Sequence, residues 1–365
     1  MVGFTSRGFG RAVGAKLKST IPYATRAAAA VAPRRATPIP AMNAPADFEL
    51  DLPFAAPPAA GAAAAAADGV QWLRMPLPFA LDHINLWLVD GAQGLAAVDT
   101  GYGDAVTRAH WQTHFATPMR GRALDQLVVT HYHPDHLGNA AWLAARFAVP
   151  VTMTHGEFLH AHCVWHEQAS MDAASMAGFL HAHGLPMAEA AALGTRLTGY
   201  RRAVPELPRT FRRMIDGDTL VLGGSAFRVI AGFGHSPEHA ALHCSERGVL
   251  VSGDMLLPRI STNISVSPGE PDGDPLQRFL DSLSRFEALP PDTLVLPSHG
   301  LPFRGIALRV AQLRAHHRAR LGELEAFVRD AARPVSAADA LPVLFRRTLD
   351  LQQRFFAMGE AIADL

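Results

Sequence analysis

The chain is poor in cysteine, in charged side chains and in long apolar runs. Only two of its 365 residues are cysteines, Cys163 and Cys244. Two are too few for a disulfide framework, so a reducing compartment is the simplest expectation. Charged residues make up 18% of the chain and apolar residues 49%, which is enough apolar content for a large core. No uninterrupted apolar stretch reaches the length of a membrane span, so no transmembrane helix is predicted.

Acidic residues are absent from the first 46 positions. This segment holds seven of the 33 Lys and Arg side chains, so the remainder is acidic, with a formal charge of about −7. Its Arg-, Ala- and Ser/Thr-containing composition is typical of an organelle transit peptide, but a disordered tail, or sequence upstream of a start at Met42, fits as well. We expect a cytoplasmic protein, or a mitochondrial one if the segment is a transit peptide. Residues 1–68, which end in a Pro/Ala-rich linker, are left outside the predicted fold.

Coordinating side chains are concentrated in VVTHYHPDHLGN, residues 128–139. His131, His133, Asp135 and His136 fall within six positions, directly behind an apolar run of strand-forming residues. Alternate side chains of a strand share a face, so the first two are expected to converge on one point and the last two on a neighbouring point. A single ion could hardly use four ligands from so short a span, which favours two adjacent divalent metals.

Further candidate ligands follow three later apolar runs. GFGHSPEH offers His235 and His239, VLVSGDMLLP offers Asp254, and TLVLPSHGLPF offers His299. Each stands just past a predicted strand, so four strand ends carry ligand-type side chains, with helices or turns between them. Such an arrangement is typical of one rim of an αββα sandwich, which is an α/β fold.

The order HxHxDH, His, Asp, His resembles the metal-binding pattern of the metallo-β-lactamase-fold hydrolase superfamily, over about residues 69–303. The resemblance implies a first metal held by His131, His133 and His235, a second held by Asp135, His136 and His299, and a bridging Asp254. Aspartate rather than cysteine at position 254 is similar to the glyoxalase II and lactonase side of the superfamily. It argues against an antibiotic-hydrolysing enzyme.

Three further residues are candidates for supporting the metals or the substrate. Asp99, in AAVDTGYG, resembles the family's structural aspartate, which supports the metal-binding turn by hydrogen bonds; a simple turn former is the alternative. His239 stands where glyoxalase II-like proteins also keep a histidine, and we expect it to support the ligands rather than to be one. Arg259 could hold a substrate carboxylate or phosphate, or it could pair with an acid of the acidic body.

The predicted ligands indicate hydrolysis. A water shared by two divalent cations loses a proton near neutral pH, and the same cations polarise a carbonyl or phosphoryl oxygen. Zn²⁺ is the expected metal, with iron or manganese as alternatives because the same ligands accept them. Asp135 is the predicted catalytic residue, because it could both hold a metal and orient the hydroxide. Neither cysteine nor any serine stands in a nucleophile motif, so a covalent route has no support.

Two helical regions accompany the predicted catalytic domain of residues 69–303. Residues 155–213, rich in His and Met, are expected to form a helical insertion over the metal rim, either as an adaptable apolar substrate wall or as an ordinary amphipathic helix pair. Residues 304–365 show a helical period and resemble the C-terminal, winged-helix-like domain of a branch that includes β-lactamase-like endoribonucleases, without the wing hairpin. His316 and His317 are expected to dock this region against the catalytic domain.

Two functions fit these sequence features. The first is a dinuclear hydrolase of a small carbonyl substrate, a thioester, ester or lactone, and the alternative is a metal-dependent endoribonuclease or phosphodiesterase. Nucleic-acid binding depends on Lys and Arg, whereas the folded body is acidic, so we favour the small substrate. The expected partner is therefore a small molecule rather than nucleic acid or a membrane, and assembly into a homo-oligomer is left open.

Overall fold

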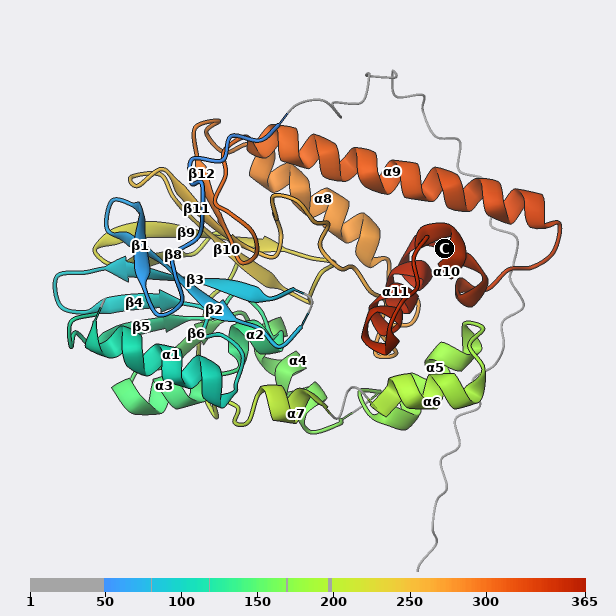
Figure 1. Cartoon of the computed structure of the whole chain (residues 1–365), viewed down its shortest axis with the longest axis horizontal. Coiled ribbons are helices and arrows are strands. Elements are labelled where there is room, and N and C mark those ends of the chain that lie inside the picture. Colours follow the sequence, from blue (N-terminus) through green and yellow to red (C-terminus); the bar gives the residue numbers. More distant parts are fainter. Residues whose placement is uncertain (1–48, 80, 118, 169, 196–198) are drawn as a thin grey trace, which may run out of the picture. The chain divides into compact units, whose positions relative to one another are not determined.

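The computed structural model describes residues 49–79, 81–117, 119–168, 170–195 and 199–365. Residues 1–46, expected to be a transit peptide or a tail, lie outside these residues. Within the described ranges the chain forms two β-sheets with helices on their outer faces (Figure 1). The αββα arrangement predicted from the four strand ends is confirmed.

The first sheet has the strand order β1-β2-β3-β4-β5-β6-β7. Its strands are β1 (Ala63–Ala67), β2 (Val70–Pro76), β3 (His83–Asp90), β4 (Leu95–Val98), β5 (Leu124–Val128), β6 (Val151–Met153) and β7 (Phe211–Arg213). Pairing is antiparallel from β1 to β4 and parallel from β4 to β7. The interior of β3, with the sequence INLWLV, is buried throughout, as expected for a strand that is covered on both faces.

The second sheet has the strand order β12-β11-β10-β9-β8. Its strands are β8 (Thr219–Leu222), β9 (Ser225–Gly232), β10 (His239–Cys244), β11 (Val249–Gly253) and β12 (Leu294–Pro297). Only β11 and β12 pair in parallel, and helix α8 (Pro275–Glu287) makes the crossover between them. Cys244 is buried in β10 and both cysteines are free thiols.

Alternate side chains of the second sheet face two different cores. Val249 and Val251 of β11 belong to the core that also contains Trp72 and Trp87 of the first sheet. Leu250, between them, packs instead with Phe279 of α8 and with residues of α9 (Ile306–Ala331). This period of two places one core between the sheets and another beneath α8 and α9.

Helices cover the first sheet as well. α1 (Ala105–Ala116) contacts β2, and α3 (Ala140–Phe147) contacts β5 and β6. Asp104 caps α1 by accepting a hydrogen bond from the Thr107 backbone N–H at 2.7 Å, which satisfies one of the amides that a helix start leaves unpaired. The short α2 (Pro134–Leu137) follows β5 and contains part of the ligand-rich turn.

Among its described residues, the predicted helical insertion forms four α-helices and ends in a strand. The helices are α4 (His155–Trp165), α5 (Ala173–Ala182), α6 (Met187–Gly194) and α7 (Tyr200–Ala203). The last residues of the segment form β7, which pairs in parallel with β6 at the edge of the first sheet. The insertion therefore also adds an edge strand to the catalytic fold.

Residues 304–365 form α9, α10 (Ala337–Leu344) and α11 (Leu351–Asp364), and these residues contain no hairpin. His317 of α9 is buried, with its ring 5.9 Å from that of Phe279 in α8, as expected for a docking residue. α10 and α11 share a core with α5 and α6. No helix in the described ranges is long and apolar enough to cross a membrane.

The fold begins earlier than the sequence indicated. β1 lies within the alanine-rich tract that was expected to be a linker, and it pairs antiparallel with β2. Before it, Phe54 packs edge-on against Trp72 with ring centroids 5.7 Å apart. Alanine has a low strand propensity, so the tract carries no strand signal of its own, and the pairing with β2 forms the strand.

Candidate metal centre

The seven predicted ligands lie in two adjacent groups. In each group, one potential ligand atom from every residue lies within 4.8 Å of the others. The first group contains His131, His133, His235 and Asp254, and the second contains Asp135, His136 and His299. The residues come from loops after β5, β9, β11 and β12, so both sheets contribute.

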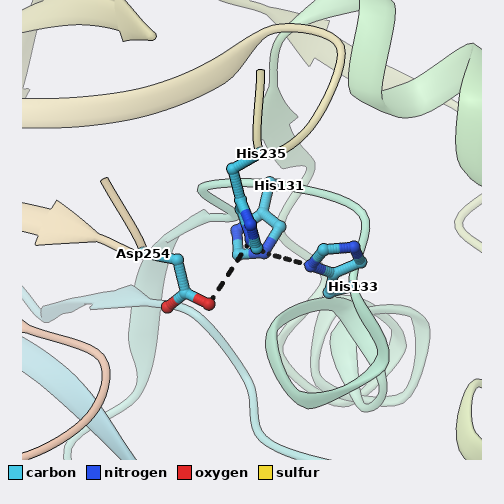
Figure 2. A group of neighbouring side chains, drawn as sticks. All are labelled: His131, His133, His235 and Asp254. Atoms are coloured by element: carbon cyan, nitrogen blue, oxygen red, sulfur yellow. Dashed lines mark hydrogen bonds and ion pairs between the residues drawn. The ribbon is translucent and has the colours of Figure 1, made fainter. Parts of the chain in front are cut away.

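The first group consists of three imidazoles and a carboxylate that face one another (Figure 2). His131 Nε2 lies 2.9 Å from His133 Nδ1 and 3.1 Å from His235 Nε2. His235 Nε2 lies 3.4 Å from Asp254 Oδ2. Ligands on a tetrahedral zinc ion are about 3.3 Å apart, because each is about 2.0–2.1 Å from the ion. These separations fit one ion held by all four side chains.

His131 and His133 converge for a reason other than the predicted one. β5 ends at Val128, so neither residue belongs to a strand, and His133 is instead the N-cap of α2. The turn between β5 and α2 brings the two rings together. Strand periodicity placed the pair correctly next to a sheet edge, but a loop makes their geometry.

The second group has the same kind of spacing. Asp135 Oδ2 lies 3.7 Å from His136 Nε2 and 3.5 Å from His299 Nε2. Asp135 and His136 come from the short helix α2 that follows β5, and His299 comes from the turn after β12. The side chain of Asp135 is 18% exposed, whereas that of His136 is fully buried, so the carboxylate faces the open side of the group.

Asp254 lies between the two groups. Its Oδ2 faces His235, while its Oδ1 lies 3.5 Å from His136 Nε2 and 3.5 Å from His299 Nε2. Within the described residues, Asp254 Oδ1 and His136 Nε2 form no hydrogen bond although both atoms are buried. Buried polar atoms are normally paired, so these two atoms have the position and the free lone pairs of metal ligands.

Asp99 fixes the ring of His136. Its Oδ2 accepts a hydrogen bond from His136 Nδ1 at 2.8 Å, and its Oδ1 accepts one from the Thr130 backbone N–H at 2.8 Å. Asp99 is buried and adopts a positive φ of 64°, a conformation that costs energy for a residue with a side chain. The structure therefore places Asp99 where the family's structural aspartate was expected, with its carboxylate bonded to a ligand and to the ligand loop.

His239 supports Asp254 from behind. Its Nε2 accepts a hydrogen bond from the backbone N–H of Asp254 at 3.1 Å. This nitrogen is therefore engaged with the backbone, and His239 is not part of either group. The ring is fully buried, so the contact holds the start of the loop that follows β11.

Backbone carbonyls orient His235 and His299, the two histidine ligands that lie outside the HYHPDH turn. His235 Nδ1 donates to Asn263 O at 2.8 Å, and His299 Nδ1 donates to His83 O at 2.8 Å. A proton on Nδ1 leaves Nε2 unprotonated and available to a metal. Asn263 and His83 were not among the predicted site residues, because nothing in a sequence shows which carbonyl faces a given ring.

The electrostatics of the centre favour positive charge. Burial by itself lowers the pKa of His136 and of His299, but the neighbouring aspartates outweigh burial and raise both pKa values. Burial would raise the pKa of Asp254, yet the two imidazoles lower it well below its usual range. Burial and adjacent rings lower the pKa of His131 and His133, which keeps these imidazoles neutral. Neutral His131 and His133 next to an ionised Asp254 are in the ligand state that divalent metals require, whereas a metal held by His136 and His299 would displace the proton that the aspartates favour there.

Glu157 joins the ligand loop after β5 to the ligand loop after β9, and it was not among the residues predicted from the sequence. Its Oε2 accepts from the Tyr132 backbone N–H at 2.9 Å, and its Oε1 accepts from Ser236 Oγ and from the Glu238 backbone N–H, both at 2.6 Å. It is fully buried in α4, and burial raises its pKa. The available signal was a lone acid directly after a strand end, in THGEF.

Arg259 is not part of either group. It is exposed, on the loop after Asp254, and it forms no hydrogen bond or ion pair with the described residues. The loop itself is fixed, because the buried Arg309 of α9 donates to Leu257 O at 2.6 Å and to Ile260 O at 2.8 Å. The structure therefore leaves Arg259 as an unpaired cation on a firmly held loop.

Comparison with known proteins places this site in a family. Residues 80–299 match the metallo-beta-lactamase superfamily, and residues 324–365 match the metallo-beta-lactamase-like C-terminal domain. The solved structure of a beta-lactamase domain protein from Burkholderia ambifaria is 47% identical in sequence, with a TM-score of 0.79, and the match covers 87% of this chain and 91% of that chain. The likeness therefore extends through both regions.

Curated relatives are more distant. The probable metallo-hydrolase YqjP of Bacillus subtilis (strain 168) is 25% identical over 299 residues, which is 80% of this chain and 90% of that protein. A hydroxyacylglutathione hydrolase of Acidiphilium cryptum (strain JF-5) is 27% identical over 214 residues, which is 58% of this chain and 63% of that enzyme. The match thus spans less than two thirds of the second relative. With its sandwich fold, its His/Asp cluster and its C-terminal helices, the chain belongs to the metallo-β-lactamase superfamily of metal-dependent hydrolases.

Proposed function

We propose that this chain is a dinuclear hydrolase of a small carbonyl substrate, a thioester, ester or lactone. The observation that carries the proposal is the position of Asp254, whose two oxygens face different ligand groups. Each group contains three further donors. A carboxylate between two sets of three donors suits two neighbouring ions.

His131, His133 and His235 would hold the first ion and Asp135, His136 and His299 the second, with Asp254 shared. Two such ions, when bound, lower the pKa of a water between them and polarise a carbonyl oxygen. Histidine and aspartate are common zinc ligands, and we propose Zn²⁺, although iron and manganese accept the same donors.

Asp135 is the proposed catalytic residue. Its side chain is 18% exposed, against 11% for Asp254, so it is the more accessible carboxylate of the centre. From this position its carboxylate orients the attacking water and accepts a proton from it. Asp99, through His136, and His239, through the backbone of Asp254, keep the surrounding groups in place.

Two observations support a small carbonyl substrate over RNA. The chain outside residues 1–46 carries an acidic formal charge of about −7, which opposes the binding of a polyanion. Several relatives are hydroxyacylglutathione hydrolases, although their identity to this chain is low. Arg259, which forms no ion pair with the described residues, is in addition proposed to attract a substrate carboxylate.

The test combines metal analysis with a substrate screen. Purified chain is assayed for bound metals, and for cleavage of acyl thioesters, esters, lactones and single-stranded RNA, with and without chelator. We expect about two metals per chain and chelator-sensitive cleavage of a thioester, ester or lactone. Cleavage of RNA alone would contradict the proposed substrate class, and an absence of bound metal in active protein would contradict the dinuclear site.

A further inference from the structure

The loop after β11 connects the metal centre to the C-terminal helices. Asn263 makes both contacts. Its backbone oxygen accepts the hydrogen bond from His235 Nδ1, and its side-chain Nδ2 donates to Glu360 Oε1 of α11 at 2.9 Å. Its Oδ1 accepts from Ser265 Oγ at 2.9 Å. Both polar atoms of the side chain are therefore occupied, and the peptide that carries the carbonyl is fixed.

α11 contacts the same loop at a second point. The Val266 backbone N–H donates to Gly359 O at 3.4 Å, and Val266 is buried in the core shared by α5, α6, α10 and α11. A Cβ at position 359 would collide with the side chain of Ser265. The helix thus approaches the loop as closely as a residue without a side chain allows.

Glu360 is held from the other side by α9. Its Oε2 lies 3.2 Å from Arg320 Nη2, which also lies 3.1 Å from Asp364 Oδ2. The three side chains are 15%, 22% and 5% exposed for Arg320, Glu360 and Asp364. A partly buried network of this kind holds its members in one geometry more firmly than an exposed pair does. One carboxylate oxygen is used for docking α11, and the other is directed to Asn263.

We propose that Asn263 and Glu360 are positioning residues for the metal centre, through which α11 fixes the ring of His235. The Asn263 carbonyl selects the tautomer of His235 and the angle at which Nε2 faces Asp254 and His131. In the second group, His136 and His299 are oriented by Asp99 and His83 instead. Loss of Glu360 should therefore weaken metal binding at the first group and leave the second group unchanged.

This inference rests on the proposed two-metal site but not on any substrate, so its test measures metal binding alone. The full-length Glu360→Ala variant is stripped of metal and titrated with Zn²⁺ against a competing chromophoric chelator. We expect the affinity of one of the two zinc sites to fall about 10- to 100-fold, the range found for residues that orient metal ligands. The other site should stay within about twofold. The visible spectrum of the Co²⁺-loaded variant should change in the same way, with one site altered.

Two variants serve as matched controls. Glu360→Gln keeps a carbonyl oxygen for Asn263 and should recover most of the lost affinity. Glu325→Ala removes a carboxylate of α9 that is 75% exposed and pairs only with Arg329, and it should bind both zinc ions as the unmodified chain does. Circular dichroism melting of each metal-free variant shows whether the fold is retained.

Two results would overturn the proposal. One is a Glu360→Ala variant with the same two zinc affinities as Glu325→Ala. The other is an equal loss at both sites together with a lower melting temperature, because that pattern indicates a general stabilising role. If Glu360→Ala does not fold, Asn263→Ala, which keeps the backbone carbonyl and removes the side-chain hydrogen bonds to Glu360 and Ser265, is judged by the same criteria. A chain that binds two zinc ions but cleaves no thioester, ester or lactone contradicts the proposed substrate and not this inference.

Discussion

At the scale of single residues, three of the five ligand histidines share one arrangement. The ring Nδ1 is occupied in each of these three, in His136 by Asp99, in His235 by the Asn263 carbonyl and in His299 by the His83 carbonyl. The remaining nitrogen of each ring is directed inward. The tautomers are therefore set by the protein before any metal arrives.

The first prediction concerns Asp135. Asp135→Asn keeps the shape of the side chain but removes its negative charge and its capacity to accept a proton. We expect kcat to fall at least about 100-fold, together with reduced occupancy of the second metal position. Steady-state kinetics and elemental analysis measure the two effects. Asp125→Asn, which changes an exposed aspartate of β5, is the control, and an Asp135→Asn variant with an unchanged rate and metal content would refute the assigned role.

The second prediction concerns Glu157. Glu157→Gln turns one carboxylate oxygen into an amide that faces a buried backbone N–H, so one of the three hydrogen bonds is lost and a donor stays unpaired. We expect the free energy of unfolding to fall by about 1–3 kcal/mol, as measured by urea denaturation. Glu206→Gln, at an exposed position, should change it by less than about 0.5 kcal/mol. Equal stability of the two variants would mean that Glu157 does not hold the ligand loops.

The sequence indicated ligands better than it indicated their supports. His131, His235 and Asp254 carry their signal in residue type and in position after an apolar run. The supporting contacts of Glu157 depend on which donors lie near it in space, and these are two backbone amides and one hydroxyl of residues 25, 81 and 79 positions away. Contacts of this kind come from tertiary packing and leave no local pattern.

At the scale of elements, the strands were the most predictable part and their exact limits the least. β9, β11 and β12 are apolar runs that end just before a ligand, and all three lie where the sequence places them. β1 was missed because its five residues are all alanine, and β7 because it is three residues long. Both are edge strands, which depend on pairing with a neighbour rather than on their own pattern.

The third prediction concerns the docking of α9 on α8 through His317. Its two ring nitrogens have no hydrogen-bond partner among the described residues, and burial lowers its pKa from 6.5 to about 4. The unfolded chain therefore binds a proton at a higher pH than the folded chain does. The contribution of this residue is fully present above about pH 6.5 and is lost as the pH falls toward 4, with a slope of at most about 1.4 kcal/mol per pH unit.

His317→Leu should remove this part of the pH dependence. We expect the free energy of unfolding of the variant to decline less than that of the unmodified chain between pH 6.5 and 4. Urea denaturation in the presence of chelator measures this decline. The chelator removes bound metal, so the pH dependence of metal binding does not enter the comparison. Parallel stability profiles for the two proteins across this range would contradict the assignment.

At the scale of the whole molecule, the metal centre lies where the two sheets meet. His131 and Asp135 follow the first sheet, whereas His235, Asp254 and His299 follow strands of the second. Each group contains residues from both sheets. A bound ion therefore links the two halves of the sandwich, in addition to the apolar core between them.

The fourth prediction follows from this link. A ligand that binds only the folded state stabilises it by about 2.7 kcal/mol when its concentration is 100 times its dissociation constant. We expect metal removal to lower the midpoint of urea denaturation, and readdition of Zn²⁺ to restore it. Asp254→Asn, which alters the residue facing both groups, should reduce the difference between the metal-free and the Zn²⁺-loaded protein. A midpoint that chelator leaves unchanged would contradict the link.

The order of the ligands along the chain has a consequence for biosynthesis. The HYHPDH turn leaves the ribosome early, but the second group stays incomplete until position 299 has been synthesised, and the α11 residues that contact the loop behind His235 follow later still. A nascent chain therefore offers only a partial set of donors for most of its translation. We therefore expect stable binding of both metals only after residue 299 has been synthesised, and a product truncated before that residue should lack a complete second group.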